Sequence, residues 1–212
     1  MNIHTQCLDA LILLVTFNPI VLVQLFLNNK KSSSESLEKS LKILASIYIV
    51  ILMGIFIMSK EKFYTNIDNN YLWYIIAVMF VPLTIILEII VGYIVVSTTN
   101  KTIPKLKISL VFKKANITVV ILSVFIGIFE EFVYRQLWFN ILFEDFNINI
   151  IAVLIIIAFV YGLNHIFLGK QVFYEKILAG IIYGCLFYFS GFNILIPIIA
   201  HCLENIVILL KG

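Results

Sequence analysis

Charged residues are scarce in this sequence. Asp, Glu, Lys and Arg make up only 13% of its 212 residues, whereas 62% are apolar. A typical soluble domain is about 25% charged and about 45–50% apolar. One water-soluble core of this size cannot bury that excess, so lipid has to solvate most of the side chains. The composition excludes an ordinary soluble protein, and a net charge of +3 gives no indication of a nucleic-acid partner.

The sequence also lacks paired cysteines and internal repeats. The three cysteines lie in apolar stretches without paired spacing, which predicts small buried hydrophobic side chains rather than disulfides or a zinc site: Cys7, Cys185 and Cys202. No repeat of 20–50 residues is visible, so we expect a single membrane domain over residues 1–212. The residues before Leu8 contain no Lys or Arg, unlike a cleavable signal peptide, so the first apolar stretch is expected to be retained.

Long apolar runs are what the sequence does contain. A helix needs roughly 20 mostly apolar residues to cross a bilayer. The runs predict an all-α, polytopic transmembrane helix bundle of about seven spans, the sixth starting at Ile177 or earlier, near Phe173. The expected spans are Leu8–Leu27, Leu41–Met58, Leu72–Val96, Ile117–Phe143, Ile150–Leu168, Ile177–Phe189 and Ile194–Leu210.

The lysines predict the orientation of these spans. With the N-terminus outside, the inward loops 28–42, 98–116 and 169–176 and the C-terminal tail hold 12 of the 14 lysines, and the outward side holds only Lys60 and Lys62. Cytoplasmic loops of membrane proteins carry such an excess of positive charge. We therefore expect a multi-pass cell-membrane protein with its C-terminus in the cytoplasm. The abundance of Ile, Lys and Asn suggests a bacterial source.

Several polar residues fall inside the expected spans. A charged side chain at the bilayer centre costs roughly 2.5–3.5 kcal/mol even on a lenient scale. Four or five isolated charges would cost as much as a domain's whole stability, so we expect these groups to pair with one another. The set is Glu88, Glu130, Glu131, Arg135, His165, His201, Glu204 and Asn205.

Arginine occurs once, inside the fourth expected span. Elsewhere the sequence uses lysine, so Arg135 indicates a need for a planar, permanently charged donor. Glu131 precedes it by four residues, a favourable order for a helical ion pair. Glu130 points about 100° away, so the two carboxylates have separate environments, a pattern typical of divided acid–base roles. The alternative is a salt-bridge network without chemistry.

Two histidines lie within the spans. His201 and Asn205 share one helical face at i,i+4 spacing, and His165 lies toward the inward end of the fifth span. A lone membrane histidine is more often a helix–helix hydrogen bond than a catalyst. Two histidines with two glutamates and an amide on three helices favour a shared site, which we expect to be a water-filled cavity.

Three short motifs resemble the CPBP family, the CAAX-processing and bacteriocin-processing (Abi-like) intramembrane proteases. The first is the double glutamate with arginine, Glu130-Glu131-Phe132-Val133-Tyr134-Arg135. The second is an aromatic residue four before a histidine, Tyr161 to His165, and the third is His201 four before Asn205. The resemblance covers residues 115–210, which it implies to be the catalytic core, whereas residues 1–114 hold the N-terminal spans and a basic cytoplasmic loop.

The chain departs from the family pattern at a few positions. Tyr161 stands where phenylalanine is commoner, and Tyr134 and Gln136 replace the usual Phe and Gly around the arginine. The tyrosines keep an aromatic wall, so both are expected to line the substrate groove. Glu204 adds a charge beside the third motif. Glu88 has no counterpart in the motifs and is expected to pair within the bundle.

The resemblance implies an intramembrane endopeptidase acting on a membrane-associated protein or peptide. In our hypothesis Glu130 and His165 hold and deprotonate a water molecule, and His201 and Asn205 donate to the oxyanion. Glu131 and Arg135 would then fix the position of Glu130. We favour a mechanism without a cofactor; the rival uses zinc held by His165, His201 and Glu130.

Two functions from other classes fit parts of the same sequence. A non-catalytic bacteriocin self-immunity or regulatory protein would share the fold. A proton-coupled transporter could use Glu88, Glu130 and Glu131 as carriers, but such folds often show internal repeats, and none is visible.

Overall fold

The chain forms a bundle of α-helices. The structure, a computed structural model, describes residues 3–26, 34–67, 70–100 and 115–211, and no β-strand occurs among them. The predicted class, an all-α membrane helix bundle, is confirmed. Most of the predicted basic loop, residues 101–114, lies outside the described residues. The helices are α1 (Ile3–Val15), α2 (Pro19–Phe26), α3 (Ser34–Met58), α4 (Tyr71–Asn100), α5 (Ile117–Glu131), α6 (Ile150–Asn164), α7 (Lys170–Phe189) and α8 (Leu195–Lys211).

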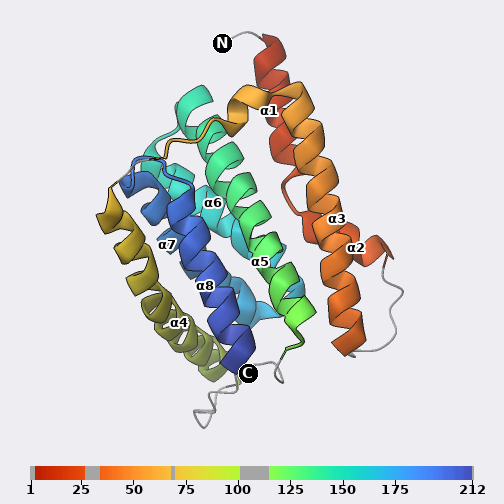
Figure 1. The fold of residues 1–212 in the computed structure, drawn as a ribbon, viewed down its shortest axis with the longest axis vertical. Helices are drawn as coiled ribbons and strands as arrows, with labels where there is room; N and C mark the ends of the chain where they lie inside the picture. The colour runs from red at the N-terminus through yellow and green to blue at the C-terminus, as the bar shows by residue number, and fades with distance from the viewer. Residues whose placement is uncertain (1–2, 27–33, 68–69, 101–114, 212) are drawn as a thin grey trace.

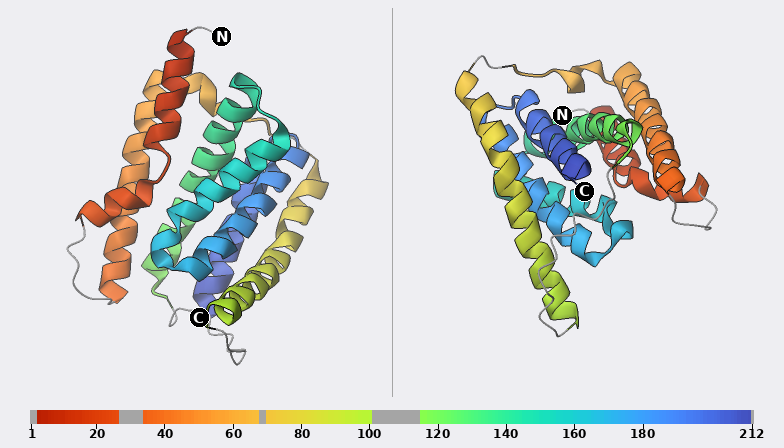
Figure 2. Two further views of the ribbon diagram at one scale, coloured as in Figure 1. Left: turned by 180° about the vertical axis from the view of Figure 1, so that it is seen from behind. Right: turned by 60° about the horizontal axis from the view of Figure 1, so that its bottom comes forward.

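Helices α5 and α8 lie side by side in the middle of the bundle (Figure 1). Behind them α6 packs along α7, and α4 covers α7 and α8 on one side, whereas α1, α2 and α3 lie on the other (Figure 2). Chain direction alternates from α3 to α8, and the two termini lie at opposite ends (Figure 1). Residues from α5, α6 and α8 can therefore meet inside the bundle.

Four helical segments are long and apolar enough to cross a membrane: Leu37–Met58, Tyr71–Asn100, Ile117–Asp145 and Lys170–Phe189. Helices α1, α6 and α8 are apolar but have fewer than 18 residues. The predicted fifth span corresponds to α6, which ends earlier than expected, at Asn164, and the predicted seventh span agrees with α8 to within one residue at each end. The count of seven spans stays a prediction.

The first predicted span, Leu8–Leu27, is wrong as a continuous helix. The chain leaves α1 at Val15 and starts α2 at Pro19, and the two helices point in different directions (Figure 1). Proline disfavours a helical residue before it and is well suited to the first helical position. Asn18 lies at this break. Its side chain accepts from the Val21 amide and donates to the Leu163 carbonyl oxygen of α6.

The predicted inward loop 169–176 is also wrong. Helix α7 already begins at Lys170, before either expected start. Lys176, which the lysine distribution placed at the cytoplasmic surface, is instead a largely buried residue in this helix. The pattern of charges could not reveal this, because an isolated lysine beside an apolar run fits either a loop or a buried ion pair.

The three cysteines are free, in agreement with the expected lack of disulfides. Their predicted burial is wrong for Cys7, which is exposed, and Cys185 and Cys202 are only partly buried. In an apolar helix both the buried and the exposed positions are hydrophobic, so hydropathy does not show which of them Cys7 occupies.

Helix α5 changes its geometry directly after the double glutamate. Residues Phe132–Trp138 and Asn140–Asp145 continue it as a π-helix, so the helical path runs from Ile117 to Asp145. π-Helical turns are rare and are frequent at functional sites. The wider turn changes which side chains of this segment face the bundle.

Small residues bring α6 and α7 into close contact. A Cβ atom at Gly180 would lie 2.9 Å from the Cα atom of Ala158, and one at Gly162 would lie 2.9 Å from the Phe173 carbonyl oxygen. Small residues at helix interfaces let backbones approach closely inside membranes. This contact sets the spacing of the side chains that α6 and α7 present to α5 and α8.

A buried lysine ties α1 to the end of the α5 segment. Lys62, in the short 3₁₀ helix Lys60–Phe63, lies 2.9 Å from Asp9 of α1 and also bonds Asp145. Sequence reasoning had placed Lys62 in solvent and overlooked Asp9, which is fully buried. Burial by itself lowers the pKa of the Lys62 ammonium, but the two carboxylates outweigh it and raise the pKa above 10.5.

We predict that Lys62→Met destabilises the protein by about 3–5 kcal/mol, because Asp9 is left buried without a counter-charge. In detergent, the thermal midpoint should fall by roughly 10 °C. Adding Asp9→Asn should recover most of the loss, and a midpoint that stays low in the double variant would contradict this explanation.

The raised pKa of Lys62 also predicts how the stability of the protein depends on pH. Stabilisation by Lys62 should be complete below pH 10.5 and disappear as the pH rises through the higher folded-state value.

Candidate active site

Three predicted site residues converge from three parts of the chain. The Glu130 carboxylate at the end of α5 lies 4.0 Å from His165 Nε2, just after α6, and 3.8 Å from His201 Nε2 in α8. Glu130 and His201 are both about 3% exposed, and the His165 side chain is 12% exposed. These distances are too long for direct hydrogen bonds but suit a single bridging water molecule.

Glu131 links two of the motifs. Its carboxylate lies 3.1 Å from Arg135 Nε and 2.7 Å from His201 Nδ1, and all three side chains are buried. The expected Glu131–Arg135 pair is therefore present. Glu131 also holds His201, and its predicted role in fixing the position of Glu130 stays a prediction. One carboxylate thus orients the imidazole while its neighbour faces the reacting space.

Aromatic rings and one carbonyl complete the surroundings of Arg135. Its Nη2 donates to the Gly180 carbonyl oxygen at 3.2 Å. Its guanidinium carbon lies 4.9 Å from the ring centre of Tyr161 and 5.5 Å from that of Tyr183. Cation–π contacts of this kind stabilise a desolvated charge. Arg135 is held by α6 and α7, so it also fixes the position of Glu131.

Hydrogen-bond partners assign the imidazole protons. His165 Nδ1 lies 2.9 Å from the Tyr161 carbonyl oxygen, and His201 Nδ1 lies against the Glu131 carboxylate. Both partners can only accept, so both Nδ1 atoms carry hydrogen. In the neutral rings, the lone pairs of both Nε2 atoms then face Glu130. Each Nε2 atom thus faces one oxygen of the Glu130 carboxylate, acceptor to acceptor, and a water molecule between them can donate a hydrogen to both.

Charge balance adds a proton to this cluster. With both histidines neutral, Glu130 and Glu131 carry two negative charges against the single positive charge of Arg135. An unbalanced charge is costly in a buried site of low dielectric constant. One extra proton on His201 or Glu130 restores neutrality. The cluster can therefore pass a proton between these two residues without changing its total charge.

Tyr48, which the sequence analysis missed, also reaches Glu130, and a second missed residue, Asn164, holds Tyr48. The Tyr48 hydroxyl of α3 interacts with the Glu130 carboxylate and accepts from Asn164 Nδ2 at 3.3 Å. Asn164 Oδ1 accepts from the Ile20 amide of α2. Both residues are fully buried. A polar Asn at the end of an apolar helix, directly before His165, was the signal available for Asn164; nothing in its apolar run distinguished Tyr48.

The two remaining intramembrane carboxylates form a separate network. Lys176 of α7 lies 2.7 Å from Glu88 of α4 and 3.1 Å from Glu204 of α8. The Tyr183 hydroxyl donates to the other oxygen of Glu204, and the Tyr183 ring stacks on His201 with centroids 5.1 Å apart. The expected pairing of Glu88 is confirmed. Glu204 faces Lys176 and Tyr183 rather than Glu130.

Asn205 lies on the α5–α8 contact. Its Nδ2 donates to the Ser123 carbonyl oxygen at 3.3 Å. A Cβ atom at Gly127 would lie 3.2 Å from Asn205 Nδ2 and 3.5 Å from His201 Cε1, so this glycine lets both side chains approach α5. Asn205 therefore joins α8 to α5 one helical turn before the double glutamate.

Tyr161 and Tyr134 form an aromatic wall beside the histidines. The Tyr161 hydroxyl lies 3.4 Å from His201 Nε2, and its ring packs edge-on against His165. The Tyr134 ring meets Tyr161 edge-on, with centroids 5.4 Å apart. Both tyrosines are fully buried.

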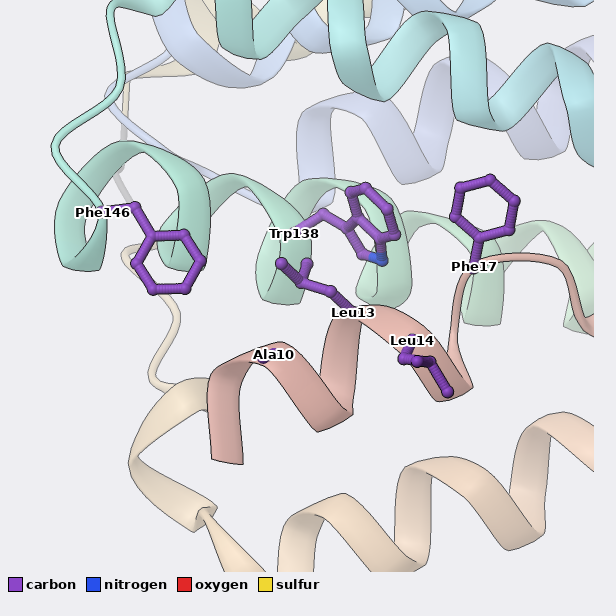
Figure 3. Close-up of a pocket in the computed structure, with 6 residues that line it drawn as sticks. All are labelled: Ala10, Leu13, Leu14, Phe17, Trp138 and Phe146. Atoms are coloured by element: carbon purple, nitrogen blue, oxygen red, sulfur yellow. The ribbon is translucent and has the colours of Figure 1, made fainter. Parts of the chain in front are cut away.

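Two hollows in the described part of the chain lie away from this cluster. One of about 520 Å³ is apolar and lies between α1 and the π-helical segment (Figure 3), lined by Ala10, Leu13, Leu14, Phe17, Trp138 and Phe146. A polar one of about 500 Å³ lies near the α7–α8 turn, lined by Glu61, Tyr64, Asn66, Gln136, Asn140, Glu144, Gly191 and Phe192. The predicted water-filled cavity at Glu130 stays a prediction.

The cluster of Glu130, His165 and His201 contains the kinds of atoms that bind zinc. Two imidazole Nε2 atoms and a carboxylate are chemically suitable zinc ligands. Among the described residues, however, no group of three or more His, Cys, Asp or Glu side chains has a spacing that could hold a metal ion.

Residues 113–207 match the model of one protein family, Type II CAAX prenyl endopeptidase Rce1-like. The resemblance to CPBP proteases that the three motifs indicated is confirmed for this segment, which contains all three. At the level of the family, the match supports an intramembrane endopeptidase of the CAAX type. No curated protein and no solved structure matches the chain.

We predict that Arg135→Lys lowers stability by about 3–5 kcal/mol, because a lysine cannot pair with Glu131, reach Gly180 and stack on two rings at once. Thermal unfolding in detergent measures the loss. Lys42→Ala is the matched control: it removes the exposed i,i+4 pair Glu38–Lys42 and should cost under about 1 kcal/mol. Equal losses in the two variants would contradict a special role for the buried pair.

Proposed function

We propose that this chain, similar over residues 113–207 to type II CAAX prenyl endopeptidases, is an intramembrane endopeptidase that uses Glu130 to activate water. The observation that carries the proposal is the gap of 3.8–4.0 Å between the Glu130 carboxylate and two imidazole Nε2 atoms. A structural ion-pair network would close such a gap with direct contacts, as Glu131 and Arg135 do. The substrate is a membrane-associated protein or peptide.

The water molecule would donate one hydrogen to Glu130 and the other to His165 Nε2. Its oxygen then attacks the scissile carbonyl carbon, and the water proton passes to Glu130 as the new C–O bond forms. The electron pair of the carbonyl double bond moves to the oxygen. Glu130 next delivers its proton to the leaving nitrogen as the C–N bond breaks. One water is consumed, and a carboxylic acid and an amine are released.

His201 is suited to stabilise the oxyanion. In its protonated form, Nε2–H points toward the reacting space, while Nδ1–H remains bonded to Glu131. A preorganised donor in a dry site is worth far more than in water. Asn205 donates one amide hydrogen to Ser123. It contributes to the oxyanion only with its second hydrogen, and it keeps His201 against α5.

In the membrane, we place the N-terminus outside and the C-terminus in the cytoplasm. The opposite termini support placing them on different sides of the membrane (Figure 1), and the lysines of residues 28–42 and 98–116 support the cytoplasmic side for the C-terminus. His165, between α6 and α7, would then lie toward the cytoplasmic side. The bilayer and the peptide substrate are the expected partners.

Glu130→Gln should reduce cleavage by about 10²–10⁴-fold, because an amide cannot take the water proton. Purified protein in detergent is assayed with a prenylated CAAX peptide carrying a fluorophore and quencher on either side of the expected bond. Glu144→Gln, at an exposed position further along the same helical path, is the control and should retain full activity. Unchanged cleavage by Glu130→Gln would show that Glu130 does not activate the water, and no cleavage by wild type would favour a non-catalytic immunity or regulatory protein.

Exhaustive treatment with 1,10-phenanthroline, followed by removal of the chelator, should leave cleavage of the same peptide unchanged. The reason is that Glu130 and the histidines can activate water by accepting its hydrogens. Activity that is lost and then restored by Zn²⁺, but not by Mg²⁺, would replace this mechanism with the zinc-dependent one.

A further inference from the structure

The Tyr134 hydroxyl has no hydrogen-bond partner within the described residues, although the side chain is fully buried. A buried hydroxyl without a partner costs roughly 1–3 kcal/mol. Phenylalanine, the commoner residue at this position in the resemblance, would pack the same ring without that cost. The oxygen atom therefore calls for an explanation other than packing.

The position of Tyr134 indicates what its hydroxyl oxygen can do. It follows Glu130 by four residues on the same helical path, so the two side chains lie on the same side of that path. Its ring is held between Tyr161 and Trp138, at centroid distances of 5.4 and 6.4 Å. Trp138 is fixed in turn by its bond to Thr16. The hydroxyl is thus a rigidly placed donor beside the reacting carboxylate.

The hydroxyls around Glu130 differ in what they bind. Tyr48 is occupied by Asn164 and Glu130, and Tyr161 lies against His201 Nε2. Of these three hydroxyls, Tyr134 is the one without a hydrogen-bond partner within the described residues. Asn205, the other expected oxyanion donor, already gives a hydrogen to Ser123.

We propose that the Tyr134 hydroxyl is a catalytic hydrogen-bond donor to the carbonyl oxygen of the scissile peptide bond. It works with His201, so that two donors meet the oxyanion. No bond to Tyr134 forms or breaks, and its proton stays on the phenol. This inference rests on the proposed endopeptidase function and identifies a further residue of the same site.

Tyr134→Phe tests the proposal because it deletes one oxygen atom. With the prenylated CAAX peptide, kcat should fall by about 10²-fold while KM stays within twofold, since the bond is made to the oxyanion rather than to the ground state. A phosphinate analogue of that peptide, which mimics the tetrahedral intermediate, should bind about 10²-fold more weakly. Tyr188→Phe, a half-buried tyrosine in the aromatic cluster around Phe143 and Phe192, should leave both values unchanged.

Thermal unfolding tests the proposal for Tyr134 without any substrate. If the hydroxyl bonds only the substrate, its removal should leave the thermal midpoint of Tyr134→Phe equal to or above that of wild type. A midpoint clearly lower than that of Tyr188→Phe would mean that the hydroxyl holds a structural bond, and it would overturn the proposal. A kcat within twofold of wild type would overturn it as well.

The two proposals fail in different ways. If wild type and Glu130→Gln cleave the peptide equally or not at all, the proposed function fails, and the thermal comparison still decides whether the Tyr134 hydroxyl is structural. If Glu130→Gln loses activity and Tyr134→Phe keeps it, only the role of Tyr134 is wrong.

Discussion

The buried contact of Glu131 with Arg135 and His201 is the interaction on which the site depends. An ionised carboxylate in a membrane interior is tolerated only with its charge balanced and its oxygens occupied. Arg135 balances the charge, and His201 occupies the second oxygen. This single carboxylate therefore joins the first and third motifs and sets the tautomer of His201. It leaves Glu130, its neighbour, free to face the place where chemistry can occur.

The requirements of Arg135 explain much of the surrounding packing. A guanidinium has five donors and a flat face, and the structure surrounds that of Arg135 with the Glu131 carboxylate, a backbone carbonyl and two aromatic rings. The carbonyl belongs to Gly180, where α6 and α7 come closest. The π-helical turn begins one residue after Glu131 and includes Arg135. Helix geometry, small residues and aromatic side chains all serve the same buried charge.

The sequence predicted the helical class, the Glu131–Arg135 pair and the meeting of Glu130 with both histidines. Each follows from the high cost of unpaired polar groups in lipid, a constraint that local sequence displays directly. It did not predict partners that depend on tertiary placement: Lys176 between Glu88 and Glu204, Lys62 beside Asp9, or Tyr48 bonded to Asn164. Hydropathy treats Pro19 as a kink within a span. In the structure α1 ends just before Thr16, whose hydroxyl accepts from Trp138, and Asn18 donates to the Leu163 carbonyl oxygen of α6.

The length of α6 has a consequence for the bilayer. Its 15 residues rise about 22 Å, whereas the hydrocarbon layer is about 30 Å thick. Helix α4, which packs on α7 and α8, has 30 residues, so the helices of the bundle differ in hydrophobic length. Such a mismatch is relieved by local thinning of the bilayer around the shorter helix. Because His165 directly follows α6, thinning at that end brings the aqueous phase toward the imidazole, and hydration can then reach the site along the protein–lipid boundary rather than through a permanent internal channel.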